Sequence, residues 1–202
     1  ATKRIPVITF KYQRGIKGFL GGDFDYERFT LKAHQTFRLG LLGRSDYTLS
    51  AGYTPSNLPA PLLFPHLGNE TFFFVRSAFS TMNYFEFVSD RYASLQLNHN
   101  FEGLFFNRLP LIKKLKWREV GFFRTVYGTV SQSNVAMNLS NITYLAPDHK
   151  PYQEFGFGIE NIGYGNLRPL RVDFTWRNEY EFNNPHNSTP KFGVLVGVKA
   201  DF

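Results

Sequence analysis

The chain has 202 residues, of which 43% are hydrophobic and 18% aromatic, with no cysteine and a formal net charge of +7. The lack of cysteine excludes disulfide scaffolds, thiolate zinc sites and cysteine nucleophiles, and the many aromatic residues exclude a disordered chain. No window approaches the roughly 18 consecutive apolar residues of a membrane-spanning helix. The positive charges are dispersed apart from a cluster between Lys113 and Arg118, so we expect no nucleic acid partner.

Eight segments alternate apolar and polar residues, which is the pattern of a β-strand with one apolar face. In chain order they cover residues 8–13, 28–39, 46–53, 92–101, 118–131, 154–160, 170–179 and 191–202. The alternation is strictest in 28–39, 170–179 and 191–202. It is ambiguous in 118–131, where Arg124 shares a face with Val120, Phe122 and Val126.

Strands of about ten residues with one apolar and one charged face are typical of a transmembrane β-barrel. We therefore predict an all-β, antiparallel barrel of about eight strands over residues 1–202, located in a bacterial outer membrane and in contact with its lipid. A soluble β-sandwich or lipocalin-like barrel is the alternative. The charged face would line the lumen, where Glu160 could pair with Arg171, or Asp173 with Arg177. The lumen-facing candidates are Arg28, Lys32, His34, Arg38, Glu160, Arg171, Asp173 and Arg177.

An even number of strands would place both ends of this segment on the periplasmic side. Residues 16–22, 55–85, 132–151 and 183–190 then become external loops, and 40–45, 103–117 and 164–168 become periplasmic connections. The loop 55–85 is long and apolar, so we expect it to fold into the lumen or onto a partner, with a plain surface loop as the alternative. The connection 104–117 permits a short interfacial helix beginning near Pro110, or a cationic turn without a specific role.

The sequence carries no strong pattern for a nucleophile, a phosphate loop or a metal centre. We therefore predict no enzyme activity, no catalytic residue, no cofactor and no metal. His34 is the one candidate for a catalytic base, because a histidine inside a barrel can activate a nucleophile. A hydrated histidine in the lumen is the favoured interpretation.

Several strings resemble the C-terminal barrel of a Bacteroidetes outer-membrane family, in which a carboxypeptidase-regulatory-like domain precedes a barrel of unassigned function. They are residues 87–103, 107–119, 157–162 and 170–174, and the resemblance covers most of 45–202. The barrel is in turn similar to the BamA-like surface-antigen superfamily, whose barrels have sixteen strands. The resemblance implies that this chain supplies the last eight strands and that a longer native protein extends before Ala1.

The resemblance also implies roles for particular residues. The superfamily's lumen-inserted loop corresponds to 55–85, with His66, Gly68, Asn69 and Glu70 near its tip, although the superfamily's Val-Arg-Gly-Phe tip is absent. The chain end resembles the terminal-Phe insertion signal of outer-membrane barrels, here Val198, Ala200 and Phe202. The implied function is assistance in protein insertion or export, or a scaffold role beside other outer-membrane or periplasmic proteins of an envelope complex. The alternatives are a complete eight-strand barrel with lipid-modifying activity and a small porin-like channel.

Overall fold

The computed structural model describes residues 5–69, 71, 73–75, 77–138, 146–165, 167–178 and 191–199. Its main feature is an eight-stranded antiparallel sheet in which strands follow one another in chain order, and all eight predicted strands are present. The strands are β1 (Val7–Gly15), β2 (Tyr26–Arg38), β3 (Arg44–Tyr53), β6 (Arg91–Asn100), β7 (Arg118–Thr129), β8 (Tyr152–Tyr164), β9 (Leu167–Arg177) and β10 (Phe192–Val198).

The connections contain little regular structure. A small hairpin of β4 (Phe64–His66) and β5 (Phe87–Ser89) lies within the long connection between β3 and β6. Two short helices follow, α1 (Pro110–Lys113) and α2 (Gln132–Met137), and one-turn 3-10 segments occur at Phe19–Gly21, Gly40–Leu42, Ala60–Leu62 and Phe106–Arg108. Pro110 does begin α1, as its fixed φ favours. None of the helices described is long and apolar enough to cross a bilayer.

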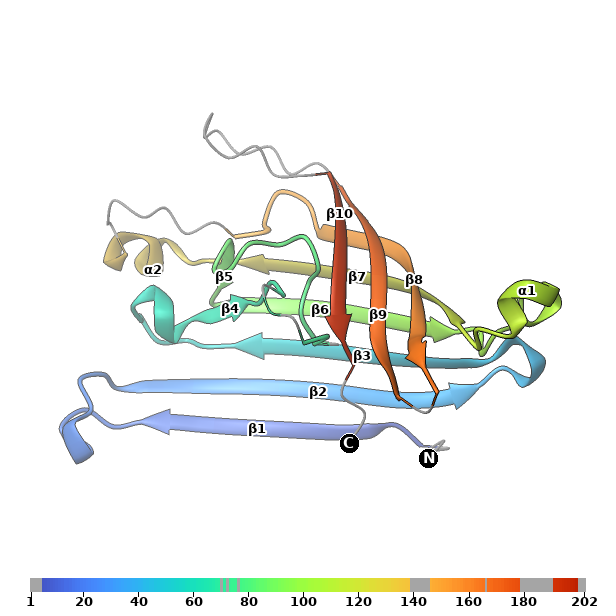
Figure 1. The fold of residues 1–202 in the computed structure, drawn as a ribbon. Helices are drawn as coiled ribbons and strands as arrows, with labels where there is room; N and C mark the ends of the chain where they lie inside the picture. Colours follow the sequence, from blue (N-terminus) through green and yellow to red (C-terminus); the bar gives the residue numbers. More distant parts are fainter. Residues whose placement is uncertain are drawn as a thin grey trace.

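The sheet is strongly curled. Figure 1 shows β8, β9 and β10 running across the direction of β3 and β6, with the hairpin β4–β5 to one side of them. Strands β1 and β10 are the two edges, and the described residues pair no strand of the sheet across them. The fold is therefore an all-β, open, curled antiparallel sheet.

The two faces of the sheet differ in chemistry. On β7 the residues of the concave face, such as Phe122, Arg124 and Val126, are buried, whereas Tyr127 on the convex face is exposed. The convex face carries large apolar side chains on all eight strands. The exposed ones include Ile8, Phe10, Tyr12, Leu31, Leu49, Tyr53, Leu97, Tyr127, Phe155, Phe157, Trp176, Phe192, Val194 and Val196.

The buried apolar core lies on the concave side, between the sheet and residues 54–90, which we call the inner loop. One cluster joins Phe79, Met82 and Phe87 of the inner loop to Val126 and Tyr152 of the sheet. A second cluster contains Leu58, Leu63 and Val88. The loop expected at 55–85 thus packs against the sheet, because most of the apolar residues of the strands point away from it and leave it to supply much of the core.

Candidate functional site

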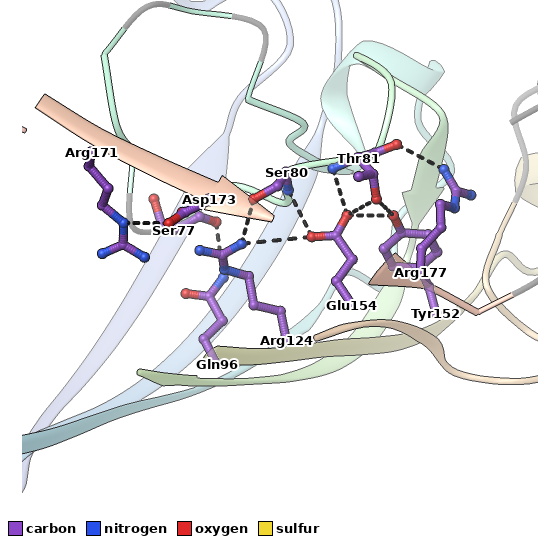
Figure 2. Close-up of polar contacts among 10 residues, drawn as sticks. All are labelled: Ser77, Ser80, Thr81, Gln96, Arg124, Tyr152, Glu154, Arg171, Asp173 and Arg177. Carbon is purple, nitrogen blue, oxygen red and sulfur yellow. Dashed lines mark hydrogen bonds and ion pairs between the residues drawn. The ribbon is translucent and has the colours of Figure 1, made fainter. Parts of the chain in front are cut away.

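The centre of the concave face holds a cluster of buried charges that binds the inner loop. Glu154 of β8 has no exposed surface and accepts hydrogen bonds from the backbone N–H groups of Ser80 and Thr81, both at 2.8 Å. Its Oε1 also accepts from the Thr81 hydroxyl at 2.7 Å and from the Tyr152 hydroxyl at 2.6 Å (Figure 2). A single carboxylate therefore fixes two consecutive peptide groups at the apex of the inner loop.

Arg124 supplies the positive charge next to Glu154. Its Nη1 lies 3.7 Å from Glu154 Oε2 and donates to the Ser80 hydroxyl at 2.7 Å, and the guanidinium stacks 4.5 Å from the centre of the Phe122 ring. Its Nε and Nη2 are buried, and no described residue forms a hydrogen bond with them. An unpaired buried charge is costly, and Glu154 supplies the countercharge that allows Arg124 to be buried here.

Arg177 of β9 makes a second attachment to the inner loop. It forms a two-pronged ion pair with Glu86, with Nη2 at 2.7 Å from Oε1 and Nη1 at 3.3 Å from Oε2. Its Nη1 also donates to the carbonyl of Thr81 at 2.9 Å, and its guanidinium lies 4.6 Å from the centre of the Tyr152 ring. Sequence analysis offered Asp173 as a partner of Arg177, but Arg177 pairs with Glu86 instead.

A third group of buried charges contains the predicted ion pair of Glu160 and Arg171. Arg171 Nε donates to Asp173 Oδ1 at 2.7 Å, and Arg171 Nη1 lies 3.7 Å from Glu160 Oε2. Glu160 also contacts Lys199 at 3.2 Å and accepts a hydrogen bond from Asn100. The guanidinium of Arg171 stacks 3.9 Å from the ring centre of Phe74 in the inner loop.

The remaining charged candidates lie on β2. Arg28 donates to the Leu63 carbonyl at 2.5 Å and stacks over Phe64, so it also holds the inner loop. Lys32 and His34 line a polar hollow of about 560 Å³. Arg38, at the end of the strand, forms an exposed pair with Glu102 at 3.2 Å.

The predicted tip residues lie at different depths in the inner loop. His66 is buried, with Nε2 at 2.9 Å from the Ser89 hydroxyl, and this burial lowers its pKa to about 4. A Cβ at Gly68 would overlap the carbonyl oxygen of Met82, so only glycine fits there. Asn69 donates from its backbone N–H to the Phe79 carbonyl at 2.7 Å. Glu70 lies outside the described residues.

Of the predicted insertion signal, only Val198 is described, and its carbonyl accepts from the backbone N–H of Phe74 at 2.9 Å. Ala200 and Phe202 lie outside the described residues. The inner loop therefore reaches the last strand of the sheet.

Three histidines pair with hydroxyl groups. Besides His66, His34 Nδ1 lies 3.0 Å from Thr48 Oγ1, and His99 Nδ1 lies 2.7 Å from Ser45 Oγ while its Nε2 faces the Leu42 carbonyl at 2.9 Å. Within the described ranges no carboxylate hydrogen-bonds to His34, His66 or His99, and no three His, Asp or Glu side chains converge as a metal site.

Sequence reasoning missed Glu154 and Tyr152, which bind the inner loop most directly, and Glu86, through which the loop binds Arg177. One signal was available, because Arg124 sits among apolar residues on one face of its strand and such a charge requires a buried partner. The identity of that partner depends on how β7 and β8 pair, with Arg124 opposite Glu154.

Comparison of the sequence with protein-family models identifies one matching family. Residues 1–136 match the model described as "Family of unknown function (DUF5686) C-terminal domain". No curated protein and no solved structure matches the chain. The matched part runs from β1 to α2 and includes the whole inner loop. Since it spans more than half of the chain, this protein belongs to that family of C-terminal domains of unknown function.

Proposed function

We propose that this chain forms part of the wall of an outer-membrane β-barrel of BamA-like type. In that role it would assist protein insertion or export, or act as a scaffold in an envelope complex. The proposal assigns no covalent chemistry to the chain. The same proposal includes membership of a bacterial envelope family in which a carboxypeptidase-regulatory-like domain precedes the barrel. This part of the proposal rests on the sequence resemblance described above.

One observation carries the proposal, which is the apolar row across the convex face. The strand register joins neighbouring side chains from β3 to β10 in a continuous line, which is Tyr47, Leu97, Phe123, Phe155, Trp176 and Phe192. An antiparallel sheet in water normally turns its polar face outward. An exposed apolar face of this extent is typical of a surface that meets lipid or another apolar partner.

The concave face supports the same interpretation. Buried charges there are matched by ion pairs with the inner loop and by polar groups around the hollow, as expected of the interior of a membrane barrel. Among the described residues the edges β1 and β10 pair with no further strand, and β10 makes only a single bridge to the inner loop at Val198, which suits a sheet that pairs with further strands to close a larger barrel.

Neighbouring substitutions on the central strand β6 test the membrane assignment. Leu97 is 40% exposed on the convex face, whereas Asn98 lines the hollow and donates to Asp46 at 3.0 Å. We expect Leu97→Arg to cost about 2 to 4 kcal/mol of stability in lipid vesicles if it lies near the bilayer centre. Asn98→Arg should be tolerated, because the new cation can approach Asp46.

The measurement is the fraction of protein that resists urea extraction and protease in vesicles. Equal tolerance of the two arginines would overturn the membrane assignment. Release of the unmodified protein from membranes by carbonate without detergent would also overturn it.

The polar hollow favours a second candidate, a narrow channel. It is lined by Val7, Thr9, Lys32, His34, Asp46, Thr48, Ser77, Gln96 and Asn98. A channel through this hollow predicts single-channel conductance in planar bilayers and a shift toward cation selectivity in Lys32→Glu. Bilayers that stay silent while the protein is inserted would exclude it.

A further inference from the structure

One end of the sheet combines exposed apolar side chains with cations. The turn β2–β3, the connection β6–β7 and the hairpin β8–β9 all lie at this end, because the strands are antiparallel and follow chain order, so that alternate connections fall at the same end. Their most exposed apolar residues are Leu41 at 93%, Leu111 at 82% and Tyr164 at 94%. Four cations in the middle connection and one at the start of β7 form what we call the basic rim: Arg108, Lys113, Lys114, Lys116 and Arg118.

The basic rim has no acidic partners within the described parts of the chain. No carboxylate there forms an ion pair with any of its five side chains. The two nearby acids have other contacts, since Glu102 pairs with Arg38, and Glu119 accepts hydrogen bonds from the backbone of Phe105 and Phe106. The positive charge of the rim therefore remains available for an external anion.

The backbone that carries the rim is held in place by side chains from neighbouring elements. Arg168 donates to the carbonyl of Leu115 and, through Nε, to that of Gly165 at 2.9 Å. Asn161 donates to the carbonyl of Lys116 at 2.6 Å. Because the backbone is already fixed, binding through the lysines would not have to order it first.

The rim also lies beside an aromatic pair on the convex side. The ring centres of Phe101 and Phe105 are 5.4 Å apart. The Phe101 ring also contacts the His99 ring and lies over Gly121. Both His99 and Gly121 belong to the convex face of the sheet. Aromatic rings next to lysines are the usual composition of a protein surface at the boundary between lipid tails and headgroups.

The opposite end of the sheet differs in charge. There the described turns 16–27 and 146–151 contain more acids than lysines, with Asp23, Asp25, Glu27 and Asp148 against Lys17 and Lys150. The concentration of unpaired cations is thus a property of the α1 end.

We propose that the basic rim binds the phosphate headgroups of anionic phospholipids in the leaflet that meets the α1 end of the sheet. This inference rests on the proposed membrane function. The apolar residues of the turns would enter the upper part of the leaflet, and the ammonium and guanidinium groups would stay at the level of the phosphates.

The two tryptophans of the chain allow a test that separates this inference from the membrane assignment itself. Trp117 lies within the rim, and Trp176 lies on the convex face of β9. Each is observed alone in the variants Trp176→Phe and Trp117→Phe. The protein is reconstituted in vesicles of equal phosphatidylcholine and phosphatidylglycerol in which only one of the two lipids has brominated acyl chains, which quench tryptophan fluorescence on contact.

Trp176 should be quenched equally by the two brominated lipids. Trp117 should be quenched more by brominated phosphatidylglycerol, with a relative association constant about fivefold in its favour. Replacing Lys113, Lys114 and Lys116 together by Gln should abolish this preference, whereas Lys17→Gln at the opposite end should preserve it. The preference should also weaken as salt is added.

Two results would overturn the inference while leaving the membrane wall intact. In the first, the two brominated lipids quench Trp117 equally. In the second, neither lipid quenches Trp117. In both cases Trp176 is still quenched. A preference that survives the triple substitution would likewise exclude the rim as its cause. If neither lipid quenches Trp176, the membrane assignment fails, and the inference fails with it.

Discussion

Glu86 and Arg177 stand 91 residues apart in the chain and form a two-pronged ion pair with only 4% and 1% of their side chains exposed. The pair joins the inner loop to β9. Since both groups have lost their water, each depends on the other for its countercharge.

We expect Glu86→Ala to lower the free energy of unfolding by about 3 kcal/mol or more, because it leaves the charge of Arg177 buried without its counterion. The exposed pair of Arg38 and Glu102 is a matched control, with 62% and 34% of the side chains exposed. Glu102→Ala should cost less than about 1 kcal/mol. Urea titration in detergent micelles measures both, and similar costs would contradict the buried role of Glu86.

Glu154→Gln should be strongly destabilising although it preserves size. A Gln side chain has an N–H group where Glu154 has an acceptor, so one of the loop N–H groups at Ser80 and Thr81 loses its partner, and Arg124 loses its countercharge. We expect a loss of about 3 kcal/mol and faster proteolysis of the inner loop.

Tyr152→Phe is the matched variant for Glu154→Gln. It removes one of the donors to Glu154 while retaining the ring that packs on Phe79 and Phe87, and it should cost about 1 kcal/mol. A larger effect of Tyr152→Phe than of Glu154→Gln would show that the Tyr152 hydroxyl, and not the carboxylate, is the main attachment of the loop.

His66 should make the protein sensitive to acid. Its pKa is about 4 in the folded protein and about 6.5 in an unfolded chain, so between these values the unfolded chain binds more protons. The free energy of unfolding should therefore decrease as the pH falls from about 6.5 to about 4, by about 3 kcal/mol in all, and level off below that.

The variant His66→Gln retains a polar partner for Ser89 but does not titrate. The difference in unfolding free energy between this variant and the unmodified protein, followed from pH 7 to pH 4, isolates the contribution of His66. Parallel curves would mean that His66 does not cause the acid sensitivity.

Asn134 of α2 links the inner loop to Asp90. Its Oδ1 accepts from the backbone N–H of Leu58 at 2.8 Å, and its Nδ2 donates to Asp90 at 3.1 Å. Burial raises the pKa of Asp90, but hydrogen bonds from Ser131 and Asn134 outweigh this and lower it below its ordinary value. Asn134→Asp would place a second carboxylate against Asp90.

We expect Asn134→Asp to lower the free energy of unfolding at pH 7 by about 2 kcal/mol, and the penalty should shrink at pH 5, where the two carboxylates share a proton. Asn134→Ala should lose stability without this recovery, because it adds no charge. Comparing the three proteins at both pH values by urea titration checks the prediction. Equal penalties for Asn134→Asp at the two pH values would contradict it.

The sequence was sufficient to predict the strands, because the period-two alternation of Phe29, Leu31 and Ala33 with Arg28, Lys32 and His34 depends only on local geometry. It also predicted that Arg171 pairs with Glu160. It did not predict the partner of Arg177, because that contact requires the sheet to curl until β9 faces the inner loop. Curvature arises from the summed twist of many strands, and no local pattern encodes it.

The glycines of β8 could be predicted from the sequence only in part. A glycine inside a strand often marks close backbone approach or curvature, and a Cβ at Gly156 or Gly158 would overlap a neighbour on β9. Sequence indicated that something approaches these residues. It did not indicate that the neighbours include the Phe174 carbonyl and the Asp173 side chain.

The position of the core on the inner loop has a consequence for the order of folding. The inner loop is synthesised before β7, β8 and β9, yet Phe79, Met82 and Phe87 pack on those later strands, which also carry the partners of the Thr81 N–H group and of the Glu86 carboxylate. Until the chain has been made as far as Tyr152, the surface that buries Phe79, Met82 and Phe87 is incomplete. The early hairpins can form from local contacts, but this segment must wait, exposed, for its long-range partners. A chaperone that binds apolar loops should therefore recognise the nascent chain in this interval and release it once β9 has paired.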